Sequence, residues 1–466
     1  MRINNTYKVI TVVLSMLTLT VLVHLARMHR LSHPNILLIT VEALRADHLG
    51  CYGYKRDTSP NIDRLAKEGT VFLNCFITSP GVATHSFVSF LTGRYLKIAE
   101  GNMFFNNVLD KDFTTLAEYL KRAGYYAAAF ITNPTLKVNK GFERGFDSYK
   151  MFGSLSRTSD AQKVTGETLE FLNDYHSDKP LFLWVHYVDP HVPYINHERY
   201  SDMFKDDALY RENDRTLELN RDPGAHPFLS EGYIPKKAFH EDRYDLNYYI
   251  ACYDSEIRYA DFYIGELLKK MKDGNTVVVL SSDHGEALGE HNVYFHHGEN
   301  IYDEVLRVPL IIKDSRYFKG GEKISASVST ADIVPTILNM ASPFRYLLNK
   351  NRFDGEELVN MLKGKDDNGR RFIYSYFPGI ASIRDVKKNN KYILNQNGKE
   401  ELYFLPDENT DRIKDDSPSI IQIRGELRGN LKNWLRHYPV RSDMKATRIS
   451  LDEENKKELK AMGYLQ

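Results

Sequence analysis

The chain has 466 residues, of which 42% are hydrophobic and 27% charged, and its 62 basic and 62 acidic side chains give a formal net charge of +0. This is the composition of a folded globular protein, long enough for a main domain and a smaller one, and the balanced charge gives no indication of a nucleic-acid partner. Three cysteines without CxxC spacing exclude a disulfide framework and a zinc-finger pattern.

Near the N-terminus, an apolar run extends from Val9 to Ala26 between basic residues. The run is long enough to cross a bilayer, and no small-x-small cleavage site follows it. We therefore expect residues 1–32 to form a transmembrane helix, a signal-anchor that holds the rest of the chain on the extracytoplasmic side of a membrane. A cleaved signal peptide and a buried soluble helix are the alternatives.

Apolar runs and amphipathic segments alternate in the next part of the chain. The expected strands are His33–Val41, Tyr125–Thr132, Pro180–Val188 and Val277–Leu280. The expected helices are one that begins at Pro60, followed by Thr114–Ala123, Thr165–Tyr175 and Tyr244–Lys272. Continuous apolar strands that alternate with helices are typical of a doubly wound, mostly parallel α/β sheet flanked by helices. We expect this catalytic domain to span residues 33–345, with a long polar insertion at about 195–243.

The pattern changes after about residue 345. Two short apolar segments, Lys391–Leu394 and Leu402–Leu405, are separated by a turn at Asn395–Gly398. They predict a small antiparallel sheet with a helix packed against it. Residues 346–466 are therefore expected to form a smaller C-terminal subdomain that ends in a charged tail.

Residues able to bind a metal or move a proton follow the apolar segments. Glu42 comes after the first expected strand, His191 after the third, and Asp283 with His284 after the fourth. Ligands of open α/β sheets bind at the carboxyl ends of the strands, so we expect these side chains to converge there. An adjacent carboxylate and imidazole are suited to a divalent metal ion. The alternative for Asp283 is a strand-end turn in which it caps a helix.

Three further histidines lie just past this pair, at His291, His296 and His297. Three histidines within seven residues are not explained by a solvent-exposed loop alone. We expect at least one of them to belong to the site.

Several motifs resemble the sulfatases of the alkaline phosphatase superfamily and occur in that family's order. They include NILLITVEALRADHLGCYGY from Asn35, SFVSFLTGRY from Ser86, HYVDPHVPY from His186 and SSDHGEALGEH from Ser281. The resemblance covers nearly all of the chain after residue 33. It implies an alkaline phosphatase-like fold and hydrolysis or transfer at an anionic ester.

The chain departs from that family at the nucleophile. Sulfatases carry a Cys or Ser that is converted to formylglycine, followed by Pro or Ala two residues later and Arg two residues beyond, and this motif is absent. Counting back from the Leu91-Thr92-Gly93 segment puts Ala83, which has no nucleophilic atom, at this position. We expect a one-residue shift that makes Thr84 the nucleophile; without the shift the protein would lack one.

The resulting hypothesis is a metal-dependent hydrolase or transferase that cleaves an anionic ester, either phosphate or sulfate, with phosphoryl chemistry favoured. A lipid- or glycan-linked ester is one option for the substrate. A Thr hydroxyl needs a metal or a base to become nucleophilic. The expected ligands of the divalent ion (Mn, Zn, Ca or Mg) are Glu42, Thr84, Asp283 and His284. This set resembles that of lipoteichoic acid synthases and phosphoethanolamine transferases.

His191 and His297 are expected to bind the non-bridging oxygens or to protonate the leaving group. Two alternatives remain for the chain. One is a hydrolase of sulfated glycans that uses another nucleophile, and the other is a catalytically degenerate, metal-binding structural protein.

Overall fold

The computed structural model describes residues 33–80, 83–95, 109–152, 160–195, 197, 199–200, 203–204, 216–219, 233–234, 243–272, 275–298, 300–361 and 370–438. The anchor expected over residues 1–32 lies outside these ranges, as does much of the expected insertion at 195–243. No helix within the described ranges has both the length and the apolar character needed to cross a bilayer.

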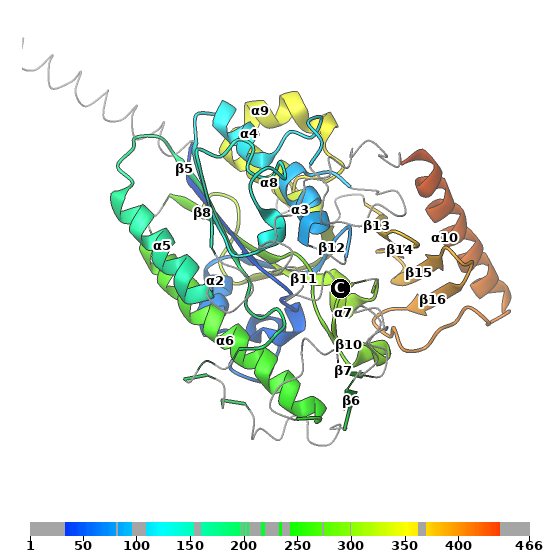
Figure 1. The fold of residues 1–466 in the computed structure, drawn as a ribbon. Helices are drawn as coiled ribbons and strands as arrows, with labels where there is room; N and C mark the ends of the chain where they lie inside the picture. The colour runs from blue at the N-terminus through cyan, green and yellow to red at the C-terminus, as the bar shows by residue number, and fades with distance from the viewer. Residues whose placement is uncertain are drawn as a thin grey trace, which may run out of the picture.

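The described residues form a central eight-stranded sheet with the strand order β12-β2-β11-β8-β1-β5-β3-β4 (Figure 1). Neighbouring strands are parallel except at β11, which is antiparallel to both β2 and β8. The strands are β1 (Asn35–Val41), β2 (Thr70–Phe76), β3 (Tyr126–Ile131), β4 (Ser148–Met151), β5 (Leu181–Tyr187), β8 (Thr276–Ser282), β11 (Arg307–Lys313) and β12 (Glu322–Ser329). The expected α/β sheet is thus confirmed as a mixed, mostly parallel one.

Helices cover both faces of this sheet (Figure 1). Helices α2, α5 and α6 contribute to one apolar cluster, and α3, α4 and α8 to the other. In β1, Leu37 and Ile39 belong to the first cluster, whereas Ile36 and Leu38 belong to the second. Because successive side chains of a strand point to opposite faces, a strand buried on both faces has an unbroken apolar sequence. The helices are α2 (Pro60–Glu68), α3 (Ala83–Thr92), α4 (Leu116–Arg122), α5 (Ala161–Asp174), α6 (Leu246–Lys270), α7 (Asp303–Leu306), α8 (Ile333–Ala341), α9 (Pro343–Asn349) and α10 (Pro418–His437).

The long helix α6 leads into the central strand β8 and matches the expected helix closely. The Asp245 side chain accepts a hydrogen bond from the Tyr248 N–H at 3.1 Å and so caps the N-terminus. Lys269 and Lys270 lie in the last turn, where positive charge stabilises the helix dipole. Its apolar residues are buried in the same cluster as those of β1 and β8.

A second sheet, smaller and antiparallel, lies beyond the main one and is covered on one face by α10 (Figure 1). Its order is β13 (Phe372–Phe377), β14 (Ile380–Asp385), β15 (Asn390–Asn395) and β16 (Glu400–Phe404). The two strands expected in this region correspond to β15 and β16. The described residues also form the short strands β6 (Glu218–Leu219), β7 (Tyr233–Ile234), β9 (Ala287–Leu288) and β10 (Tyr294–His296).

Candidate active site

Glu42 follows directly after β1, in the centre of the main sheet, and its side chain is 2% exposed. Its backbone N–H donates to the Tyr187 carbonyl at 2.8 Å, which continues the pairing of β1 with β5. The Oε1 atom accepts a hydrogen bond from Asn133 Nδ2 at 2.7 Å, and Oε2 lies 3.4 Å from His186 Nε2. Burial lowers the pKa of His186 to about 4, so this neighbouring ring is neutral.

Asp283 and His284 lie at the carboxyl end of β8, beside β1, and both are fully buried. The His284 Nδ1 atom lies 2.8 Å from the Gly285 carbonyl oxygen. A carbonyl oxygen can only accept, so Nδ1 carries a hydrogen, and in the neutral ring Nε2 then presents a lone pair. That lone pair lies 3.5 Å from Asp283 Oδ2, and neither atom forms a hydrogen bond with any described residue. Two buried acceptors facing each other repel unless a proton or a metal ion lies between them.

The ligand atoms of Glu42, Asp283 and His284 all lie within 4.8 Å of one another. Two carboxylate oxygens and an imidazole nitrogen form a donor set suited to a divalent cation. Burial raises the pKa of the Asp283 carboxyl to about 6, and the charge of Glu42 acts in the same direction. A bound cation would offset the cost of holding both carboxylates ionised, so these residues fit a divalent metal ion.

Two further imidazoles adjoin this group. The His297 ring stacks on the His284 ring with centroids 3.9 Å apart, and the His191 ring lies 5.1 Å from that of His297. His297 Nδ1 lies 3.3 Å from Glu286 Oε1, and His191 Nδ1 lies 2.5 Å from the Val192 carbonyl oxygen. Each Nδ1 therefore faces an acceptor, and each Nε2 is the atom able to exchange a proton with a bound substrate. Five of the six residues expected in the site thus lie in one packed group.

Thr84, the sixth expected residue, lies in the first turn of α3 and is 6% exposed. Its hydroxyl forms no hydrogen bond with any described residue, and so none with Glu42, Asp283 or His284. One turn later, the Phe87 ring lies 5.0 Å from the ring of His186, which contacts Glu42. Residues three apart share one face of a helix. Thr84 therefore lies on the face of α3 that, at Phe87, contacts His186.

Arg45 supplies a buried positive charge beside this edge. Its guanidinium binds Asp47 Oδ2 at 2.8 Å and Glu290 Oε1 at 2.8 Å, and it donates to the Glu286 carbonyl at 3.0 Å. The last two contacts tie the turn after β1 to the segment after β8. Arg45 thus holds together the two segments that carry the three candidate metal ligands.

Besides Arg45, three residues of this arrangement were not expected from the sequence. Asn133 and His186 contact Glu42, and Glu286 contacts His297. His186 is an imidazole within an otherwise apolar run, and Asn133 follows the expected strand Tyr125–Thr132 at its carboxyl end. Both features were available in the sequence, but each has an ordinary structural explanation.

Comparisons with known proteins place this fold in a family. A family model described as Sulfatase matches residues 34–343. The arylsulfatase of Clostridium perfringens is 26% identical over 437 residues, which cover 80% of this chain and 87% of that protein. An ulvan-active sulfatase of Formosa agariphila is 29% identical, over 72% of this chain and 66% of that protein. The phosphonate monoester hydrolase of Agrobacterium radiobacter shares the fold with a TM-score of 0.67, at 20% identity over 87% of this chain and 96% of that one.

The family match extends over well more than half of the chain and includes every residue expected in the site. The resemblance to sulfatases seen in the sequence motifs is thereby confirmed. The chain belongs to the sulfatase family, and it is a hydrolase that acts on ester bonds.

Proposed function

We propose that this chain cleaves a phosphate ester with Thr84 as its nucleophile and a divalent metal ion held by Glu42, Asp283 and His284. The facing lone pairs of His284 Nε2 and Asp283 Oδ2, 3.5 Å apart, are the observation on which the metal assignment rests. The assignment of Thr84 rests on its buried hydroxyl and on the absence of a formylglycine motif at residues 83–87. A chain without formylglycine lacks the usual nucleophile for sulfate esters, which favours phosphoryl chemistry.

In this proposal the Thr84 hydroxyl attacks the phosphorus atom, so that an Oγ1–P bond forms as the ester O–P bond breaks. A bound divalent ion would lower the pKa of the attacking hydroxyl and polarise the ester. The hydroxyl proton passes to a base, and the departing alcohol receives a proton from the imidazole of His191 or His297. The α3 N-terminus, where Thr84 lies, favours an anion electrostatically. Water or an acceptor alcohol then releases the phosphoryl group from Thr84.

The same site can also be assigned to a sulfate ester on a glycan. The relatives favour this second candidate, because the curated proteins named above are an arylsulfatase and an ulvan-active sulfatase. The two candidates differ in the atom attacked and in the nucleophile required. A sulfatase without formylglycine would need a nucleophile other than the one that this family usually employs.

The Thr84→Ala variant tests the proposed nucleophile. We expect it to lose activity on an aryl phosphodiester by at least about 10³-fold while its metal content is unchanged, because only the attacking atom is removed. The Thr84→Ser variant should retain partial activity. Activity would be measured in parallel on an aryl phosphodiester, an aryl phosphomonoester and an aryl sulfate.

Thr92→Ala is the matched control, since Thr92 lies on the same helix and donates its hydroxyl to the Val88 carbonyl at 2.6 Å. Full activity of Thr84→Ala would show that Thr84 is not the nucleophile. Wild-type turnover of the aryl sulfate alone would favour the second candidate. No turnover of any of the three esters by a metal-loaded wild-type protein would count against both.

A further inference from the structure

A second group of potential metal ligands lies outside the site described above. Asp189 follows β5, Glu256 lies within α6, and His197 belongs to the segment that connects these elements. One ligand atom from each lies within 4.8 Å of the other two. Asp189 and Glu256 are both 2% exposed. None of the three belongs to the group around Glu42, and the proposed function does not use them.

The distances within this group fit a shared ion better than direct hydrogen bonds. His197 Nε2 lies 3.4 Å from Glu256 Oε2 and 3.7 Å from Asp189 Oδ1. Both carboxylates lie within ion-pair distance of this buried nitrogen, but neither contact has the geometry of a direct hydrogen bond. Two ligands held at about 2.1 Å by one tetrahedral ion are about 3.4 Å apart. The three side chains thus have the spacing of ligands around a common centre.

Each of the three ligands is held in its orientation by a contact on its far side. The other oxygen of Asp189 accepts from the Ala161 N–H at 2.8 Å, and the other oxygen of Glu256 accepts from the Ile195 N–H at 2.5 Å. The His197 ring stacks on the Tyr259 ring at 3.4 Å with an interplanar angle of 11°. Such outer contacts orient the ligands of protein metal sites. They direct the remaining oxygens and Nε2 at one another.

We propose that Asp189, His197 and Glu256 bind a second divalent transition-metal ion, of the Zn²⁺ or Mn²⁺ class. One imidazole with two carboxylates suits these ions, whereas Ca²⁺ and Mg²⁺ prefer oxygen ligands alone. The His197 side chain is 11% exposed, which gives an ion a route from solvent. The bound ion would link the segment after β5 to α6. That segment also contains His191.

The competing occupant is a proton. Burial alone lowers the pKa of His197, but Asp189 and Glu256 together raise it to about 10. Without a metal ion, the cluster would therefore be an imidazolium between two carboxylates. The two occupants predict different metal stoichiometries, so the choice between them is open to direct measurement.

The experiment compares metal content in full-length variants. Purified protein is stripped with EDTA and loaded with Zn²⁺ alone or Mn²⁺ alone. Free ion is then removed by gel filtration, and bound metal is measured by mass spectrometry. We expect two equivalents in the wild type, one in His197→Ala, one in Asp283→Asn, and none in the double variant. His176→Ala, which removes an exposed histidine, should retain both equivalents.

The variant Glu256→Gln controls for a folding defect in His197→Ala. It keeps the shape of the side chain and an oxygen that accepts from the Ile195 N–H. It should also lose one equivalent, with an unchanged circular dichroism spectrum. One equivalent in the wild type that Asp283→Asn loses, or two in both His197→Ala and Glu256→Gln, would overturn the proposal and assign the cluster to the proton. Because Asp283→Asn reports on the first site separately, failure of the two sites can be distinguished.

Discussion

Each candidate metal ligand in this protein is oriented by a hydrogen bond made by its other polar atom, the one that does not face the ion position. His284 presents a lone pair at Nε2 because Nδ1 faces the Gly285 carbonyl at 2.8 Å. Glu42 is held on the opposite side of the site by Asn133 in a similar way. Outer contacts of this kind orient metal ligands and are almost as important for affinity as the ligands themselves. At the residue scale, the candidate metal site therefore includes residues that would not touch the ion.

Removal of the amide of Asn133 should weaken the metal site without removing a ligand. We expect Asn133→Ala to lower Mn²⁺ affinity by about 10- to 100-fold, because Glu42 loses the 2.7 Å hydrogen bond that orients its carboxylate. Isothermal titration of the EDTA-treated protein measures this affinity. Asn173→Ala, at an exposed position of α5, is the control. An Asn133→Ala protein with wild-type affinity would show that Glu42 needs no such support.

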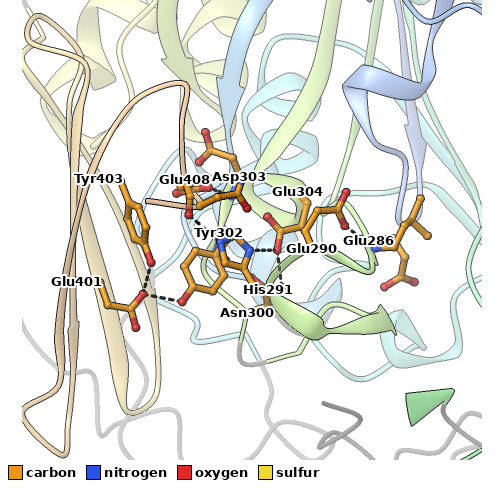
Figure 2. A network of polar contacts seen from close by, with 12 residues as sticks. Glu286, Glu290, His291, Asn300, Tyr302, Asp303, Glu304, Glu401, Tyr403 and Glu408 are labelled. Carbon is orange, nitrogen blue, oxygen red and sulfur yellow. Dashed lines mark hydrogen bonds and ion pairs between the residues drawn. The ribbon is translucent and has the colours of Figure 1, made fainter. Parts of the chain in front are cut away.

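At the scale of elements, a polar network joins the segment after β8 to the C-terminal sheet (Figure 2). His291 Nδ1 lies 3.1 Å from Glu304 Oε1, and Nε2 lies 3.0 Å from the Glu408 carbonyl oxygen. The ring also stacks on Tyr302, whose hydroxyl donates to Glu401 of β16 at 2.6 Å. Since both nitrogens of His291 face acceptors, both must donate, and the ring is an imidazolium in this arrangement.

This network makes part of the stability dependent on pH. Burial alone would lower the pKa of His291, but the hydrogen bond to Glu304 raises it above its usual value. A raised pKa in the folded state adds stability that is complete below the unfolded pKa of about 6.5 and is lost as pH rises through the folded pKa. We therefore expect His291→Gln to be less stable than the wild type at pH 6, by about 1–3 kcal/mol, and the gap to narrow at pH 9.

Thermal denaturation of both proteins at the two pH values measures this gap. His176→Gln, at an exposed position, should follow the wild type throughout. A gap that is equal at pH 6 and pH 9 would mean that the imidazolium does not contribute.

At the scale of the whole molecule, β1 and β8 lie side by side within a sheet covered on both faces (Figure 1). Both strands end in candidate ligands, Glu42 and Asp283, so packing of the core sets the geometry of the site. Leu38, four residues before Glu42, is fully buried in one of the two apolar clusters. Core stability and metal binding are therefore expected to be linked through β1.

The Leu38→Ala variant tests the packing of this core. Removal of a fully buried leucine side chain leaves a cavity and should destabilise the fold by about 2–5 kcal/mol. Leu348→Ala makes the same change at a position that is 67% exposed and should alter stability by less than about 0.5 kcal/mol. The midpoints of thermal denaturation provide the comparison. Similar midpoints for the two variants would contradict the central role of β1.

Much of the fold could be predicted from the sequence because its signals are local. The apolar run of β8 and the periodic helix α6 both lie close to their expected bounds. The antiparallel direction of β11 was not anticipated, because strand direction depends on how the chain returns through α7 rather than on the sequence of β11. The same limit applies to the site, where the positions after strands were evident but their supporting partners were not.

The sequence by itself determined the family, the alternation of strands and helices, and the polar residues that follow the strands. These properties follow from motif order, side-chain periodicity and the rule that parallel strands present their carboxyl ends at one edge. Tertiary structure decided that Asn133 holds Glu42 across 91 residues, and that Asp189, His197 and Glu256 form a separate cluster. Such contacts arise only when distant segments pack together, because a local pattern carries no information about which remote side chain completes a hydrogen bond or a ligand set.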